Sequence, residues 1–290
     1  MLLSSIWGAS FLFMRIGAPV LGAVWLIFAR LFFATAFLVG VAVWSRRAPG
    51  GFQHWRFFMV LAFFNSALPF VLLGHAATTL PAWLMGVLNA TAPMWAALIG
   101  AVWLRAPITG RTALGLVLGM AGVALLAGVE SLHLPSGGLG GIFSVLGAAF
   151  CYDIAMHDTK SRAAPSVTPF ANAYGSMAAG LLWLLPVLPF APLPSSLSGA
   201  MPAGVVIGAV LGLGILCSGM AYLIYFRLVA DIGATSTLTV TYLVPVFGIL
   251  WGVLFLGESV GWHTLAGGLV VLAGTMLVTG FSPRKLLGPR

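Results

Sequence analysis

Acidic side chains are scarce in this chain, which has five Asp and Glu residues against thirteen Lys and Arg among 290 residues. So few carboxylates, scattered along the chain, offer no pair for general acid–base catalysis. The HExxH and GxSxG patterns of hydrolases and the phosphate-binding GxxxxGK[ST] loop are also absent. Cys151 and Cys217 lie in apolar segments without CxxC spacing, so neither a redox pair nor a metal site is indicated. We therefore expect no enzyme, no cofactor and no metal.

Charge of either sign is rare: 6% of the residues are charged and 61% are hydrophobic, with a mean hydropathy of +1.10. These values lie far outside the range of a soluble domain. Apolar runs such as 117–129 are hydrophobic on every side, unlike the alternating strands of a membrane barrel. The composition predicts an all-α protein embedded in the lipid bilayer.

Ten apolar stretches are long enough, at about 20 residues each, to cross a bilayer. They are predicted at 1–17, 21–44, 55–79, 82–104, 111–129, 138–157, 168–189, 202–227, 234–256 and 262–281. The first is not preceded by the basic segment of a signal peptide, and Arg15 follows its apolar run. Because it is the shortest, residues could be missing before Met1.

Basic residues gather in alternate loops and at the carboxyl-terminal tail. The ones assigned to a single side are Arg46, Arg47, Arg56, Arg105, Arg111, Lys160, Arg162, Arg227, Arg284, Lys285 and Arg290. Cytoplasmic loops are enriched in Lys and Arg, so both termini are expected in the cytoplasm of a bacterial inner-membrane protein. The net charge of +8 is accounted for by these helix ends, and nucleic acid is not an expected partner.

A long segment of the chain occurs twice. Residues 82–128 align without a gap with residues 234–280, which matches Pro93 with Pro245, Gly115 with Gly267, Gly122 with Gly274 and Gly128 with Gly280. Residues 1–130 and 138–283 are therefore predicted as two five-helix repeats. Since five is odd, the second repeat enters the membrane from the opposite side. Inverted repeats are typical of secondary transporters.

Pro93 and Pro245 lie near the middle of equivalent spans. Each lacks the N–H that would pair with the carbonyl four residues earlier, which frees the carbonyls of Asn89 and Thr241. These polar side chains could simply bond within their helices. The alternative is that both kinks line a central cavity near the midplane.

Ionisable residues inside the spans are few. Arg30 either faces the protein interior or bends to an interface. His75 is a packing histidine or a cavity residue. Asp153 is an internal partner for a basic group, Arg30 included, or a substrate-contact or coupling residue.

Aromatic residues away from span ends are the remaining candidates for a cavity; they are Trp7, Trp95, Tyr152, Tyr222 and Tyr242. Packing is the usual role of such side chains. If some line a cavity, they favour flat, partly apolar ligands with a polar handle. GxxxG spacings indicate close helix contacts without identifying a dimer interface, so a monomer is favoured.

Several motifs resemble the two EamA repeats of the drug/metabolite transporter superfamily. They are WGASFLFMR at Trp7, FARLFFA around Arg30, the P-x-x-x-x-L spacing at both prolines, FLGES at 255–259, and the glycines at 267 and 274. Within the superfamily, the chain is most similar to bacterial aromatic amino acid exporters. The resemblance implies a cavity between spans 1, 3, 4, 6, 8 and 9, with spans 5 and 10 peripheral.

On that basis Trp7, His75, Asn89, Tyr152 and Tyr242 are the expected cavity residues. The first repeat reads WLRAP where the second reads FLGES, so no acid matches Glu258, for which a structural role is expected. Span 1 also lacks the glutamate of small multidrug exporters, and their proton-coupled mechanism is not carried over.

The sequence thus predicts a secondary exporter of amino acids, aromatic and other neutral ones, or of similar small metabolites, working by alternating access. Other metabolites or drugs are the alternative substrates. A channel would show rings of charge or a filter loop, and an intramembrane enzyme lacks its motifs. Ion coupling stays open.

Overall fold

The computed structural model describes residues 1–46, 54–103, 105–130, 136–162, 167–194, 202–232, 237 and 239–280. Side chains are described for the same residues except 127–130, 156–162, 230, 232 and 239. Of the basic residues used to predict topology, Arg47, Arg284, Lys285 and Arg290 lie outside the described residues, as do the side chains of Lys160 and Arg162.

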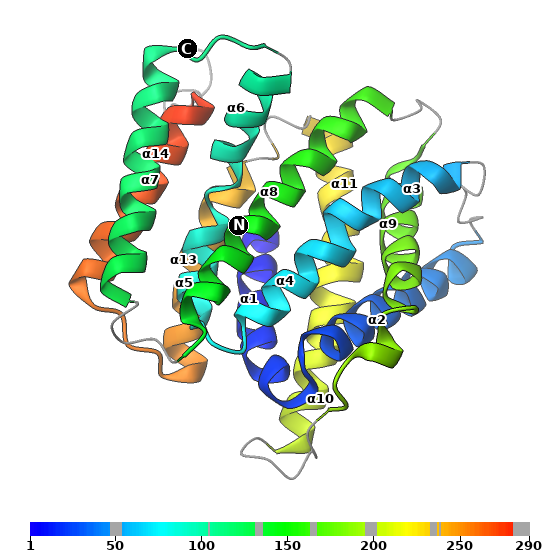
Figure 1. Ribbon diagram of the computed structural model, residues 1–290. Helices are drawn as coiled ribbons and strands as arrows, with labels where there is room; N and C mark the ends of the chain where they lie inside the picture. Colours follow the sequence, from blue (N-terminus) through cyan, green and yellow to red (C-terminus); the bar gives the residue numbers. More distant parts are fainter. Residues whose placement is uncertain are drawn as a thin grey trace.

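Helices make up the regular structure of the described chain (Figure 1). Those before residue 131 are α1 (Leu2–Leu21), α2 (Ala23–Trp44), α3 (Trp55–Ala62), η2 (Phe63–Ala67), α4 (Leu68–Ala76), α5 (Ala82–Asn89), α6 (Ala92–Trp103) and α7 (Gly110–Glu130). Those after it are α8 (Gly138–Arg162), α9 (Pro169–Leu184), η3 (Leu188–Phe190), α10 (Ala203–Leu211), η4 (Gly212–Met220), α11 (Ala221–Ile232), α13 (Thr239–Leu256) and α14 (Trp262–Thr279).

Seven helical segments of the described chain are long and apolar enough to cross a membrane, and two shorter apolar helices cover 110–126 and 240–256. Helices span the membrane because they satisfy their own backbone hydrogen bonds in hydrocarbon. The all-α prediction is confirmed, whereas ten crossings stay a prediction.

The prediction for the first span was wrong at its end. Helix α1 continues to Leu21 and contains Arg15 and Pro19, because Arg15 is held by the protein rather than by an interface. Its Nη1 donates to the carbonyl oxygens of Ala77 and Thr78 at 3.0 and 3.2 Å. At 20 residues, α1 is two residues shorter than α2 and still long enough to cross a bilayer.

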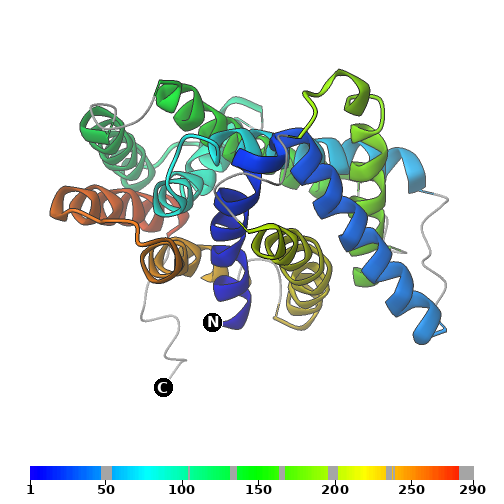
Figure 2. The same ribbon diagram turned by 90° about the horizontal axis from the view of Figure 1, so that it is seen from below.

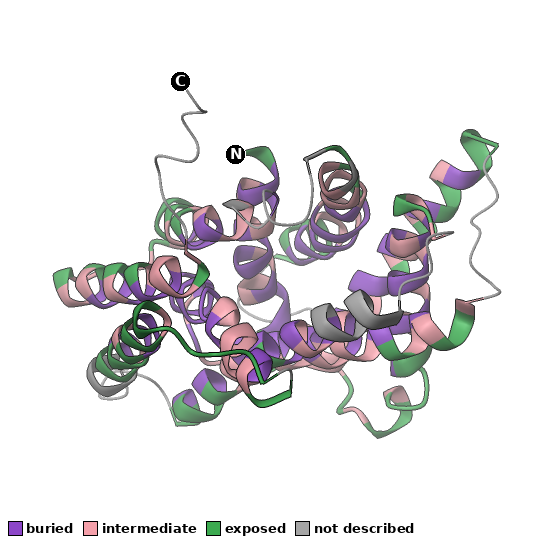
Figure 3. Cartoon of the chain, turned by 90° about the horizontal axis from the view of Figure 1, so that it is seen from above, coloured by how far each residue is buried: buried purple, intermediate pink, exposed green. Residues whose placement is uncertain are grey.

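The outward faces of the helices are apolar, as expected of surfaces that meet lipid tails. Large hydrophobic side chains more than half exposed on α7, α8 and α14 are Leu114, Val117, Met120, Leu139, Phe143, Trp262 and Leu269. Figure 3 shows the same division, with buried positions turned toward the middle of the molecule. A multi-pass membrane protein follows from these faces.

Helix α1 lies in the middle of the molecule, between α13 on one side and η4 with α10 on the other (Figure 2). Small residues allow this placement. A Cβ on Gly8 would lie 2.6 Å from the Cβ of Phe247, and one on Gly17 would lie 2.7 Å from Leu26. Close approach at such residues is the usual way membrane helices associate.

Helices α7 and α14 lie side by side in both views (Figures 1 and 2) and run antiparallel. Gly115 faces Gly274, since a Cβ on Gly115 would lie 2.7 Å from the Gly274 carbonyl oxygen. Gly122 faces Gly267, whose carbonyl oxygen would be 3.1 Å from its Cβ. The alignment of the two halves pairs Gly115 with Gly267 and Gly122 with Gly274, so each contact is the repeat mate of the other.

The ends of α6 and α13 also repeat one geometry. Arg105 and Gly257, which are repeat mates, both have positive φ, 51° and 63°. The N–H of the next residue then donates six residues back, from Ala106 to Gly100 and from Glu258 to Gly252, at 3.2 Å in each case. Glycine adopts this left-handed conformation without steric strain, whereas arginine does not.

The two equivalent prolines act differently. Pro93 follows a break between α5 and α6, whereas Pro245 lies inside a continuous α13. At the break, Thr91 Oγ1 donates to the Leu88 carbonyl at 2.7 Å and Thr275 Oγ1 of α14 donates to the Ala90 carbonyl at 3.0 Å. Threonine hydroxyls therefore satisfy carbonyls that the break exposes.

Candidate functional site

Arg30 is buried about a third of the way along α2, with 3% of its surface exposed. Its Nε donates to Ser218 Oγ of η4 at 2.7 Å, and its Cζ lies 3.5 Å from the centre of the Phe70 ring on α4. Nη1 approaches Met14 Sδ of α1 at 4.0 Å. Elements from both sequence repeats thus meet around one cation.

Two tyrosines lie near the Arg30 side chain, and one of them contacts further aromatic rings. These are Tyr152 of α8 and Tyr222 of α11. Asn65 Nδ2 of η2 donates to the Tyr222 hydroxyl at 3.4 Å. Trp7 of α1 meets Tyr222 edge-on, with 6.3 Å between ring centres, and lies 5.3 Å from the Tyr225 ring. We call the following set the Arg30 cluster: Trp7, Met14, Arg30, Asn65, Phe70, Tyr152, Ser218, Tyr222 and Tyr225.

Wide helical turns position part of the cluster. η2 and η4 are π-helical segments in spans 3 and 8, and such turns are often found at functional sites. They occupy equivalent places in the two repeats, with Ser66 in η2 as the mate of Ser218 in η4. Ser218 Oγ also donates to the Leu213 carbonyl at 3.0 Å. Ser66 Oγ is buried and lies near Tyr222 of the cluster.

Two of the five expected cavity residues, Trp7 and Tyr152, belong to the Arg30 cluster. His75 is exposed near the end of α4. The Tyr242 hydroxyl donates to Thr279 Oγ1 of α14, so it lies against the last helix. Asn89 ends α5 at the break, and its Oδ1 is buried without a partner in the described chain.

Asp153 is buried on α8, next to Tyr152. The groups that contact or electrostatically face Arg30 in the described chain are a hydroxyl, a thioether, an aromatic ring, a thiol and two tyrosines. The Asp153 carboxylate is not one of them. An ion pair between Asp153 and Arg30 therefore stays a hypothesis.

Sequence reasoning missed five members of the Arg30 cluster: Met14, Asn65, Phe70, Ser218 and Tyr225. The alignment of the two halves held one signal, because Ser66 matches Ser218 and Phe70 matches Tyr222. Recurrence of a serine followed four residues later by an aromatic residue, in the middle of equivalent spans, indicates a shared local geometry.

Glu258 has a structural contact between the repeats. Its carboxylate accepts the N–H groups of Ala82 and Trp83 at 2.8 and 3.3 Å. These are the first two residues of α5, whose N-cap residue, Pro81, makes no side-chain cap. A carboxylate at a helix N-terminus accepts hydrogen bonds from N–H groups that have no partner within the helix, and its negative charge is stabilised by the helix dipole.

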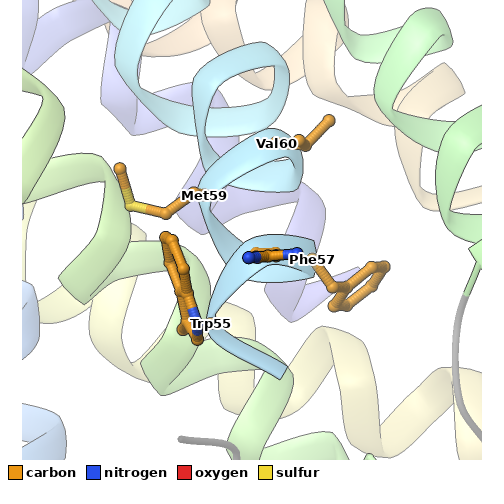
Figure 4. Close-up of a pocket in the computed structure, with 5 residues that line it drawn as sticks. Trp55, Phe57, Met59 and Val60 are labelled. Carbon is orange, nitrogen blue, oxygen red and sulfur yellow. The ribbon is translucent and has the colours of Figure 1, made fainter. Parts of the chain in front are cut away.

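A separate hollow of about 440 Å³ lies along the first turns of α3. Figure 4 shows its lining of Trp55, Phe57, Met59 and Val60, to which Arg56 adds the polar part. Trp55 and Arg56 are exposed at a predicted cytoplasmic end, where aromatic and basic side chains anchor helices at the interface. No converging polar groups mark this hollow as a substrate site in the described chain.

Comparison with known proteins gives consistent results. A family model described as the EamA-like transporter family matches residues 1–128 and 139–280. An "Uncharacterized transporter" of Archaeoglobus fulgidus is 28% identical over 295 residues, covering 94% of this chain and 93% of that protein. The "Uncharacterized transporter YoaV" of Bacillus subtilis is 27% identical over 174 residues, 60% of this chain and 58% of its own.

One crystal structure has a TM-score of 0.63 at 17% identity, with 98% of this chain and 96% of that chain covered. At this identity the likeness concerns the fold alone.

Proposed function

Because this chain belongs to the EamA-like transporter family, we propose that it is a secondary transporter that exports small metabolites from the bacterial cytoplasm by alternating access. The proposed substrates are amino acids, aromatic and other neutral ones first, and similar small molecules. Two inverted repeats, 1–130 and 138–283, form the mechanical halves of this carrier.

The antiparallel contact between α7 and α14 carries the proposal. Gly115 and Gly122 face Gly274 and Gly267 in reverse order, which is the arrangement expected of equivalent helices that cross a bilayer in opposite directions. A pseudo-two-fold axis in the membrane plane lets the two halves exchange conformations. That exchange converts an inward-open carrier into an outward-open one.

The Arg30 cluster is the proposed substrate region. Its side chains come from α1, α2, η2 and α4 in the first repeat and from α8, η4 and α11 in the second. A site between the halves can be exposed alternately to each side. His75, Asn89 and Tyr242 remain proposed lining residues outside this cluster, and Asp153 remains a proposed coupling residue.

Orientation is proposed from charge. Arg46, Arg56, Arg105 and Arg111 are exposed at helix ends that the inverted topology places on one side. The positive-inside rule assigns that side, with both termini, to the cytoplasm.

Counterflow in liposomes tests the transport proposal. Purified protein is reconstituted with unlabelled L-phenylalanine inside and trace labelled substrate outside, with and without a proton gradient. A carrier shows a transient, saturable accumulation of label, and a channel shows none. Absence of counterflow for amino acids, nucleobases and cationic dyes alike would refute the proposal.

A further inference from the structure

The buried charge of Arg30 is not balanced by its described surroundings. A guanidinium stays protonated in proteins and presents five N–H donors in a planar fork. A charge inside a membrane protein faces a partner, a cavity or a pathway. The exposed Arg227 has such a partner in Asp231 at 2.8 Å, whereas the contacts described for Arg30 include no carboxylate.

The fork of Arg30 has donors to spare. Nε is used by Ser218, and Nη1 has only a thioether at 4.0 Å, which is a weak acceptor. Nη2 makes no hydrogen bond within the described part of the chain. The two nitrogens that could hold both oxygens of a carboxylate are therefore the ones without a strong acceptor.

Arg30 is also not needed to satisfy its neighbours. Ser218 Oγ donates to the Leu213 carbonyl at 3.0 Å whether or not Nε is present. The Phe70 ring makes no hydrogen bond to Arg30 that removal of Arg30 would break; it contacts the guanidinium through its face. Removing the guanidinium would take a donor from Ser218 Oγ alone, and that hydroxyl keeps its own bond to Leu213, so a purely structural role does not account for a charge at this depth.

We propose that Arg30 binds the carboxylate of the transported substrate, so that this carrier takes organic monocarboxylates with an aromatic or apolar body. This inference rests on the proposed transport function. One cation balances one carboxylate, whereas a doubly charged phosphate would leave a net negative charge in the membrane interior. The same cation repels organic cations such as dyes.

The aromatic part of the Arg30 cluster accommodates the substrate's body. Tyr222 lies within electrostatic range of Arg30 and contacts Trp7, which in turn contacts Tyr225. A polar end at Arg30 thus continues into rings from α1 and α11. Offset and edge-on ring contacts favour a flat aromatic substituent over a branched polar one.

Equilibrium binding to the purified full-length protein in detergent tests the assignment. The probes are 3-phenylpropanoate, its neutral amide, 2-phenylethylamine and phenyl phosphate, measured by titration calorimetry. We expect the acid to bind on the order of 10- to 100-fold tighter than the amide, as loss of a charged hydrogen-bonded pair implies. Binding of the amine is expected to be weaker still.

Variants separate binding from folding. Arg30→Gln should bind the acid and the amide with about equal affinity. Arg30→Lys should retain part of the preference for the acid, because the positive charge stays while the planar guanidinium fork is lost. Arg227→Gln, which removes an exposed arginine, should keep the full preference. The melting temperature of Arg30→Gln should equal or exceed that of the wild type.

Equal affinity of the wild type for acid and amide, or no saturable binding of the acid, would overturn the proposal. Tighter binding of phenyl phosphate would overturn the carboxylate assignment. A lower melting temperature for Arg30→Gln with an unchanged preference would show a structural role instead. Acid-selective binding without counterflow would refute transport and leave the Arg30 site standing. Counterflow of the amide as fast as that of the acid would support transport and refute the Arg30 assignment.

Discussion

Removing the Glu258 carboxylate should destabilise the contact between the repeats by a predictable amount. It accepts two backbone N–H groups of α5, at 2.8 and 3.3 Å. Hydrogen bonds to charged groups contribute about 1.5–3 kcal/mol. Because one bond is long and Glu258 is only half-buried, we expect Glu258→Ala to lower the free energy of unfolding by about 2–3 kcal/mol in total.

For a chain of this size, that loss corresponds to a melting temperature lower by roughly 3–5 °C. Thermal unfolding of the purified protein in detergent measures it. Ser259→Ala, at the exposed neighbouring position, should leave the melting temperature unchanged. A Glu258→Ala protein that melts with the wild type would refute the capping role.

Gly252 provides an independent check on the same carboxylate. A Cβ at Gly252 would clash with Glu258 Oε2, whereas one at its repeat mate Gly100 meets nothing within 4 Å. Gly252→Ala should therefore destabilise the wild type, and Gly100→Ala should be neutral or stabilise it by up to about 1 kcal/mol. In the Glu258→Ala background, Gly252→Ala should become neutral or stabilising, because the clashing atom is gone. Additive losses would contradict this account.

Two further predictions concern glycines and are measured by the same unfolding assay. Gly257→Ala should destabilise by about 1–2 kcal/mol because its φ is positive, while Arg105→Gly should relieve strain and raise stability by up to about 1 kcal/mol; a stabilising Gly257→Ala would contradict the left-handed geometry. Gly274→Ala should cost about 1–3 kcal/mol because its Cβ would lie 2.6 Å from the Gly119 nitrogen. Gly40→Ala, with open space around it, should not lower stability. Equal losses of stability for Gly274→Ala and Gly40→Ala would refute the close contact of α7 with α14.

The sequence was sufficient for the properties that follow from hydropathy and repetition. The all-helical membrane class was predicted and is confirmed, and the resemblance to EamA repeats is confirmed by the family match. The narrower assignment to aromatic amino acid exporters is part of the proposal. Glu258 was expected to be structural, and its contact with Ala82 and Trp83 supplies the physical reason.

Rotations of helices about their own axes were not predictable from one sequence. His75 and Tyr222 both belong to apolar spans, yet the first is exposed and the second is buried beside Arg30. The alignment of the two halves could not show that the chain breaks before Pro93 and continues through Pro245. Part of the reason is that Thr275, which donates to the exposed carbonyl of Ala90, is distant in sequence. Wide turns at η2 and η4 also shift the face that each helix presents.

Labelling with a membrane-impermeant thiol reagent tests the inverted repeats most directly. Pro107 and Ser259 are repeat mates and are both exposed, while the native Cys151 and Cys217 are buried. In intact cells, Ser259→Cys should react from outside and Pro107→Cys only after the membrane is opened. Reaction of both cysteines from the same side would contradict the inversion on which the proposed carrier depends.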